Sequence, residues 1–180
     1  MASAGAQRVE SRPLAPVPAP QDDVIERDEL CVLRRASLAV RLTPSLWLWT
    51  AVSRKVRQVL GFAFGQRDRA TLALCWSDVP AVYQHKPVVT DGYQTYTSFF
   101  PPEQHRAIDK ASGQIGETSI VESLNTKWRQ RQSGLARRSW GVSRRIETDL
   151  VERFFLLVEQ HHLARQRLWE REQKTIRLEQ

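Results

Sequence analysis

The sequence is poor in the residues and motifs on which several classes of enzyme depend. Its only cysteines, Cys31 and Cys75, lie far apart without a CxxC spacing, so neither a disulfide framework nor a zinc ribbon is supported. We expect both to be buried in the core. The four histidines form no HExxH arrangement. A phosphate-binding GxxxxGK(S/T) loop and a GxGxxG loop are also missing, so nucleotide hydrolysis is not supported.

The chain also lacks a long apolar run. No segment approaches the roughly 20 apolar residues that span a bilayer, and the N-terminus has no apolar core of a signal peptide. We therefore expect an intracellular, cytoplasmic protein without a membrane partner.

Basic residues exceed acidic ones. The chain has 27 Lys and Arg against 20 Asp and Glu, which gives a net charge of +7. Most of the excess is arginine, whose planar fork binds phosphate and stacks on bases. A polyanion such as nucleic acid is the expected partner, although a basic surface can also serve solubility alone.

Composition and patterning divide the chain into three regions. Residues 1–21 are rich in Pro and Ala, which predicts a disordered arm. Residues 22–145 are long enough for a domain with a hydrophobic core. Residues 146–180 form a C-terminal helical region, with an amphipathic pattern that ends at about Leu168 and a charged end that is expected to fray.

Apolar patterning predicts alternating strands and helices. Strands are expected over residues 24–32, 46–52, 56–64, 86–90 and 106–108, and helices over 68–79, 93–100 and 119–132. Polar residues 53–55 predict a hairpin between the second and third strands, and residues 112–117 a loop. This order is that of a ribonuclease-H-like α/β domain, a mixed sheet with flanking helices.

Three acidic residues stand where a metal-dependent nuclease needs them. Asp28 lies on a predicted strand, Asp91 ends another strand before Gly92, and Glu122 lies on a predicted helix. Two acids from neighbouring strands and one from a later helix can hold two divalent cations. Because side chains alternate along a strand, Glu29 is expected to point away from Asp28, so that only one of them faces the metal pocket.

Each acid also has a simpler explanation. Asp28 could belong to an exposed acidic turn, since Asp22, Asp23 and Glu26 are also nearby. The Asp91-Gly92 pair is ordinary turn chemistry. Glu122 could lie on a solvated helix face.

A basic stretch follows Glu122. Between residues 127 and 145 there are seven basic residues and no acidic one. Arg129 lies seven residues after Glu122, nearly two helical turns, and therefore on the same face. Salt-dependent contact with DNA is expected from this region. The candidate DNA-binding residues are Asn125, Lys127, Arg129, Arg131, Arg137 and Arg138.

Seven short segments stand out in order along the chain: Asp28-Glu29-Leu30, Leu46-Trp47-Leu48-Trp49, Phe64-Gly65-Gln66-Arg67-Asp68, Thr90-Asp91-Gly92-Tyr93 with Tyr96, Pro101-Pro102-Glu103-Gln104-His105-Arg106, Val121-Glu122-Ser123-Leu124-Asn125 and Arg129-Gln130-Arg131. Together they resemble the catalytic domain of transposases of the insertion-sequence-one family. Each segment is weak evidence, but their order is specific.

The resemblance implies a ribonuclease-H-like fold with Asp28, Asp91 and Glu122 as catalytic, metal-binding acids and Arg129 as the basic residue after the glutamate. It implies cleavage at the ends of a DNA element and transfer of the freed 3′-hydroxyl to target DNA, with two Mg²⁺ ions that Mn²⁺ can replace. A homo-oligomer on DNA, associated with the bacterial nucleoid, is the implied state.

Two other functions fit the same sequence. Related proteins carry a zinc-binding and helix-turn-helix region upstream, whereas this chain has the Pro/Ala-rich arm there. An inactive or regulatory DNA-binding remnant is therefore one alternative. A ribonuclease-H-type hydrolase that cuts without joining is the other.

Overall fold

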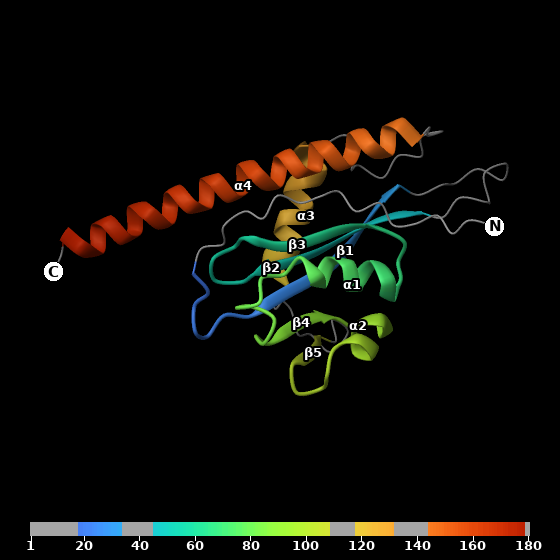
Figure 1. Cartoon of the computed structure of the whole chain (residues 1–180), viewed down its shortest axis with the longest axis horizontal. Helices are drawn as coiled ribbons and strands as arrows, with labels where there is room; N and C mark the ends of the chain where they lie inside the picture. Colours follow the sequence, from blue (N-terminus) through green and yellow to red (C-terminus); the bar gives the residue numbers. More distant parts are fainter. Residues whose placement is uncertain (1–17, 34–44, 109–117, 132–143, 179–180) are drawn as a thin grey trace.

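A five-stranded mixed sheet forms the centre of the protein (Figure 1). The computed structural model describes residues 18–33, 45–108, 118–131 and 144–178. The strands are β1 (Ile25–Leu33), β2 (Leu46–Ser53), β3 (Val59–Gly65), β4 (Val88–Asp91) and β5 (His105–Ile108). They are ordered β3-β2-β1-β4-β5. The first three form an antiparallel meander, and β4 is parallel to both β1 and β5.

Within the described ranges, four helices accompany the sheet: α1 (Arg69–Ser77), α2 (Gln94–Phe99), α3 (Ser119–Arg131) and α4 (Arg144–Leu178). The helices cover both faces of the sheet. Side chains alternate between the two faces of a strand, and alternate residues of β1 and β2 accordingly belong to two different core clusters. Leu30 of β1 and Leu48 of β2 pack in one cluster with residues of α3 and α4. Ile25 of β1 and Trp49 of β2 pack in the other with residues of α1 and α2.

The hairpin between β2 and β3 is confirmed, but it is longer than the sequence predicts. β3 begins at Val59 rather than at residue 56, because Arg57 takes a left-handed conformation with φ of 58° and ends the turn. The buried Asp23 supports this turn. It accepts hydrogen bonds from the hydroxyl of Ser53 and from the backbone N–H of Lys55.

The predicted C-terminal helix is confirmed, and its charged end is helical as well. α4 continues to Leu178, although fraying was expected from Glu170 onward, since its last turns contain neither Gly nor Pro and include a Gln166–Glu170 side-chain contact at 3.1 Å. Phe154 and Val158 bury its inner face in the same core as Trp128 of α3. Beyond that contact, α4 extends well past the sheet (Figure 1).

The structure confirms the predicted ribonuclease-H-like arrangement of a mixed sheet with helices on its faces and a C-terminal helix. Cys75 is buried as expected, whereas Cys31 is only partly buried, because it lies late in β1 opposite the half-buried Trp47. Most of the predicted arm and the predicted loop at 112–117 lie outside the described residues. Among the helices that the structure describes, none has the length and apolar run needed to cross a membrane.

Candidate functional site

Strand β1 supplies polar side chains to both faces of the sheet. Its sequence Ile25-Glu26-Arg27-Asp28-Glu29 alternates, so Glu26 and Asp28 contact α3 while Glu29 contacts α2 on the other face. Glu26 and Glu29 are both buried. A buried carboxylate requires hydrogen-bond donors or a positive charge beside it, and Glu26 and Glu29 each have both.

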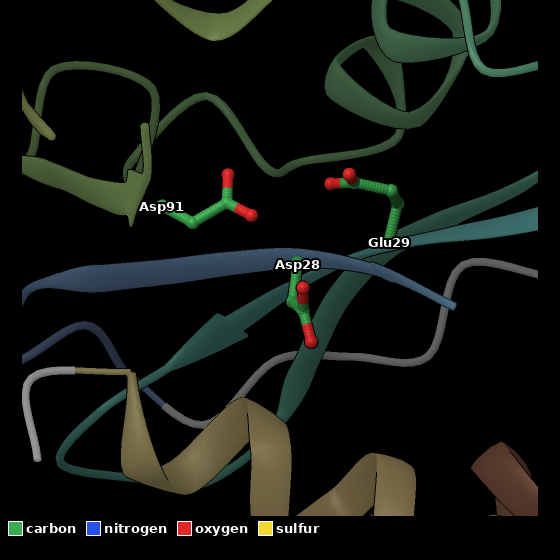
Figure 2. Close-up of side chains that lie close together, drawn as sticks. All are labelled: Asp28, Glu29 and Asp91. Carbon is green, nitrogen blue, oxygen red and sulfur yellow. The ribbon is translucent and has the colours of Figure 1, made fainter. Parts of the chain in front are cut away.

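Three carboxylates come together beside β1. One oxygen from each of Asp28, Glu29 and Asp91 lies within 4.8 Å of one oxygen from each of the other two. Figure 2 shows Glu29 and Asp91 on one side of β1 and Asp28 leaving the strand toward the opposite side. Oxygen donors at this spacing suit a hard divalent cation.

Asp91 reaches this group because β4 runs parallel to β1. Val88 and Val89 pair with Ile25 and Glu26, and continuing that register places Asp91 beside Asp28. Oδ1 of Asp91 accepts a hydrogen bond of 3.1 Å from the backbone N–H of Tyr93, which fixes the carboxylate at the end of its strand.

The structure brings Glu29 into the group, which the sequence argument excluded. The alternation itself is correct, but it does not keep the Glu29 carboxylate away from the group, because one of its oxygens lies within 4.8 Å of one oxygen of Asp28 and one of Asp91. Asp91 lies at the level of both residues, and its carboxylate is within reach of each of theirs.

Asp28 is crowded by negative charge. Burial, followed by the charges of Glu29 and Asp91, raises the pKa of its carboxyl to about 7. The amide of Asn125 donates a hydrogen bond of 2.8 Å to Asp28 Oδ2, which favours the ionised form and offsets part of that rise. A cation placed among these acids would favour the ionised form far more strongly.

Glu29 is held by Arg67 and Tyr96. Nε of Arg67 donates to Glu29 Oε1 at 2.8 Å, with a second donation from Nη2, and the hydroxyl of Tyr96 donates to Oε2 at 2.7 Å. Burial raises the pKa of Glu29, and these donors oppose the rise. Both of its oxygens therefore already have hydrogen-bond donors.

Helix α3 is anchored to β1 at its N-terminus. Oε2 of Glu26 accepts hydrogen bonds from the backbone N–H groups of Ile120 and Val121, at 2.9 and 3.1 Å. Oε1 of Glu26 accepts from Nε of Arg54 at 2.7 Å. A carboxylate at this position satisfies N–H groups that the helix itself leaves unpaired.

Glu122 lies on this anchored helix but outside the group of three acids. Its Oε1 accepts a hydrogen bond of 2.8 Å from the hydroxyl of Thr118. Asn125, which contacts Asp28, follows three residues later and therefore on the same side of α3.

The predicted DNA-binding residues differ in exposure. Lys127 and Arg131 are exposed on α3, and Arg129 is half-buried. Asn125 is 4% exposed with its amide directed at Asp28, an arrangement suited to holding that acid. Arg137 and Arg138 lie outside the described residues. The interleaved Trp128 is part of the core.

Sequence reasoning missed the partners Arg67 and Tyr96. Both stand within segments that carry the family resemblance, which is the one signal that could have singled them out. Arg67 is separated from Glu29 by 38 positions and Tyr96 by 67, so local pattern does not reveal either contact.

The sheet order and the acids at adjacent parallel strands define a ribonuclease-H-like protein with a candidate metal site. The model of a family described as IS1 transposase matches residues 34–175. The match covers most of the chain, which therefore belongs to the IS1 transposase family. Asp91 and Glu122 lie inside the matched range, and Asp28 lies shortly before it. No curated protein matches the chain.

Proposed function

We propose that this chain is a DNA transposase that cuts a phosphodiester at the end of a DNA element and joins the freed 3′-hydroxyl to target DNA. Membership of the IS1 transposase family supports the transposase class. The observation that carries the chemistry is the grouping of Asp28 and Asp91 on adjacent parallel strands of a ribonuclease-H-like sheet.

The residues beside β1 suit divalent metal ions. All the donors are oxygens, which Mg²⁺ and Mn²⁺ prefer over softer ligands. Burial, followed by the negative charges of Glu29 and Asp91, raises the pKa of Asp28 to about 7, and a bound cation would offset both effects. Oδ1 of the buried Asn125 has no hydrogen-bond partner among the described residues, so an acceptor oxygen is left unsatisfied beside Asp28.

Asp28, Asp91 and Glu122 are the residues we assign to hold two Mg²⁺ ions, which Mn²⁺ can replace. When bound, such ions activate the attacking hydroxyl and stabilise the leaving oxygen. Glu122 is supported as the third ligand by its place on α3, one turn before Asn125. Glu29 is the weaker choice because both of its oxygens are held by Arg67 and Tyr96.

The chain's own groups prepare this site. The N–H of Tyr93 and the amide of Asn125 orient Asp91 and Asp28 before substrate arrives. Preorganised acids need less rearrangement in the transition state.

DNA is the proposed partner, both at the element's ends and at the target. The proposed phosphate contacts are Lys127, Arg129 and Arg131 on α3, with Arg137 and Arg138 later in the chain.

We place the protein on the bacterial nucleoid in the cytoplasm. A homo-oligomer is proposed, with α4 as the candidate surface for self-association. The three regions 1–21, 22–145 and 146–180 remain our proposed division of the chain.

A strand-transfer assay tests this function. Purified protein is incubated with supercoiled target plasmid, a labelled DNA bearing the element's ends, and Mg²⁺ or Mn²⁺. A labelled joined product is expected. Cutting without joining would indicate a ribonuclease-H-type hydrolase, and salt-sensitive DNA binding without cutting would indicate an inactive or regulatory remnant.

A further inference from the structure

Arg67 occupies a rigid position at the edge of the acid group. It lies between β3 and α1, where the indole N–H of Trp49 donates to the carbonyl of Gln66 at 2.9 Å and the hydroxyl of Tyr93 donates to the carbonyl of Arg67 itself at 3.0 Å. The next residue, Asp68, caps α1 by accepting from the backbone N–H of Thr71 at 2.9 Å. The backbone is therefore fixed around Arg67.

The guanidinium of Arg67 is fixed as well. Its Cζ atom lies 3.9 Å from the ring centroid of Tyr93 and 4.8 Å from that of Trp47. One side of the fork, Nε and Nη2, donates to Oε1 of Glu29. Aromatic rings against the guanidinium and a carboxylate on one edge hold the plane of the group in a single orientation.

One edge of this fork remains open. A guanidinium has five N–H donors, and within the described residues only Glu29 accepts hydrogen bonds from the Arg67 side chain. The side chain is 37% exposed. The rings lie against the guanidinium, so an incoming group is expected to meet its remaining donors in the plane of the fork.

An oxyanion is the chemical group that suits these donors. Coplanar N–H groups bind phosphate in a bidentate manner with charge assistance. The field of Asp28, Glu29 and Asp91 would otherwise repel a phosphate that approaches them. Burial lowers the pKa of Arg67, but the hydrogen bonds to Glu29 and the charges of Glu29 and Asp91 outweigh burial and raise it, so the guanidinium stays charged.

We propose that Arg67 binds a DNA phosphate beside the acid group, with Glu29 serving mainly to hold its fork in place. This inference rests on the proposed function. It gives Glu29 a positioning role, since its carboxylate orients Arg67. It also adds a phosphate contact on the β3–α1 side of the site, away from the basic residues of α3.

The test compares two variants that share one background. In Glu29→Gln, the amide oxygen of the glutamine can still accept from Arg67, so the fork keeps an acceptor while the buried charge is removed. The further change Arg67→Gln then does not leave Glu29 as an unpaired buried charge. Binding of a fluorescein-labelled DNA duplex is followed by anisotropy at several salt concentrations. Ca²⁺ is held constant, and a denaturing gel verifies that the duplex stays uncut.

Relative to Glu29→Gln, the double variant should bind about ten-fold more weakly, and the slope of log K against log salt should become shallower by about 0.9, as expected for one lost phosphate contact. In the wild-type background, Arg67→Lys should keep the slope but not the full affinity, because lysine keeps the charge and loses the fork. An equal slope in the two Glu29→Gln proteins would overturn the proposal.

Arg69→Gln is the matched control. Arg69 is also an exposed arginine against an aromatic ring, Phe99, but it donates to the carbonyl of Ser98 on α2. Its replacement should leave the salt slope unchanged, and an equal loss there would also overturn the proposal. Wild-type protein that cuts DNA while Arg67 variants bind normally would reject the Arg67 contact alone. Wild-type protein that never cuts would reject the transposase function.

Discussion

The amide of Asn125 donates a hydrogen bond of 2.8 Å to Oδ2 of Asp28. This contact joins the middle of α3 to the middle of β1, 97 positions apart in the chain. Because Glu26 holds the N-terminus of the same helix, two alternate carboxylates of β1 fix where α3 lies. The helix that carries Glu122 is thus attached to the strand that carries Asp28.

Replacing Asp28 with asparagine should stabilise the metal-free protein at alkaline pH. The folded pKa is raised from 3.8 to about 7, so the folded state binds the proton more tightly and the free energy of unfolding of the wild type falls as pH rises from about 4 to 7. A shift of this size corresponds to a gain on the order of 4 kcal/mol for the variant at pH 8.

Urea unfolding at pH 4 and pH 8 in EDTA measures this difference. The gap between Asp28→Asn and wild type should be small at pH 4 and large at pH 8. A gap of equal size at both values would mean that Asp28 does not titrate with a raised pKa.

Metal binding should depend on pH through the same group. Divalent ions bind the ionised carboxylate, so the affinity for Mn²⁺ should fall as pH drops below about 7, approaching ten-fold per unit. Isothermal titration of wild type at pH 6 and pH 8 checks the effect, and Glu103→Gln, which changes an exposed acid outside the group, is the control. Affinity that does not change with pH would argue against Asp28 as a ligand.

Replacing Glu26 with alanine should destabilise the fold. The change leaves two N–H groups at the start of α3 without their acceptor and removes the partner of Arg54, which should cost about 2 to 4 kcal/mol. Urea unfolding measures it. Asp22→Ala removes a pair with Lys55 in which the Asp22 side chain is 78% exposed, and it should have no measurable effect. Equal losses in both variants would show that the burial of Glu26 is irrelevant.

Gly61 should not tolerate a side chain. A Cβ atom there would lie 2.5 Å from the carbonyl oxygen of Cys75 on α1, so Gly61→Ala should push α1 from β3 and lower stability by about 1 to 3 kcal/mol. Gly92→Ala is the control, because a Cβ at Gly92 would meet nothing within 4 Å. Thermal unfolding of the two variants should separate them clearly, and similar midpoints would contradict the close packing of α1 on β3.

Much of the fold could be predicted because its signals are local. The change from strand to helix patterning gave the element order, and the Val-Val-Thr run before Asp91 gave a buried strand with an acid at its end. The parallel pairing of β4 with β1 then brings Asp91 to Asp28, as the ribonuclease-H-like order requires.

The remaining features depend on contacts between distant parts of the chain. The left-handed turn at Arg57 is supported by Asp23 from before β1. Alternation along β1 predicts on which face of the sheet Glu29 lies. It does not predict which neighbouring elements bring hydrogen-bond donors for Glu29 to that face. Arg67 and Tyr96 supply them from the β3–α1 junction and from α2.

Cleavage of DNA by matched acid variants is the most direct test of the metal-dependent function. Nicking of supercoiled plasmid is measured with Mg²⁺ and with Mn²⁺ for wild type, Asp91→Asn, Glu122→Gln and the exposed-acid control Glu103→Gln, after circular dichroism verifies that all four are folded. We predict that wild type and Glu103→Gln cut only when metal is present and that the other two do not cut. Undiminished cutting by folded Asp91→Asn would contradict the account.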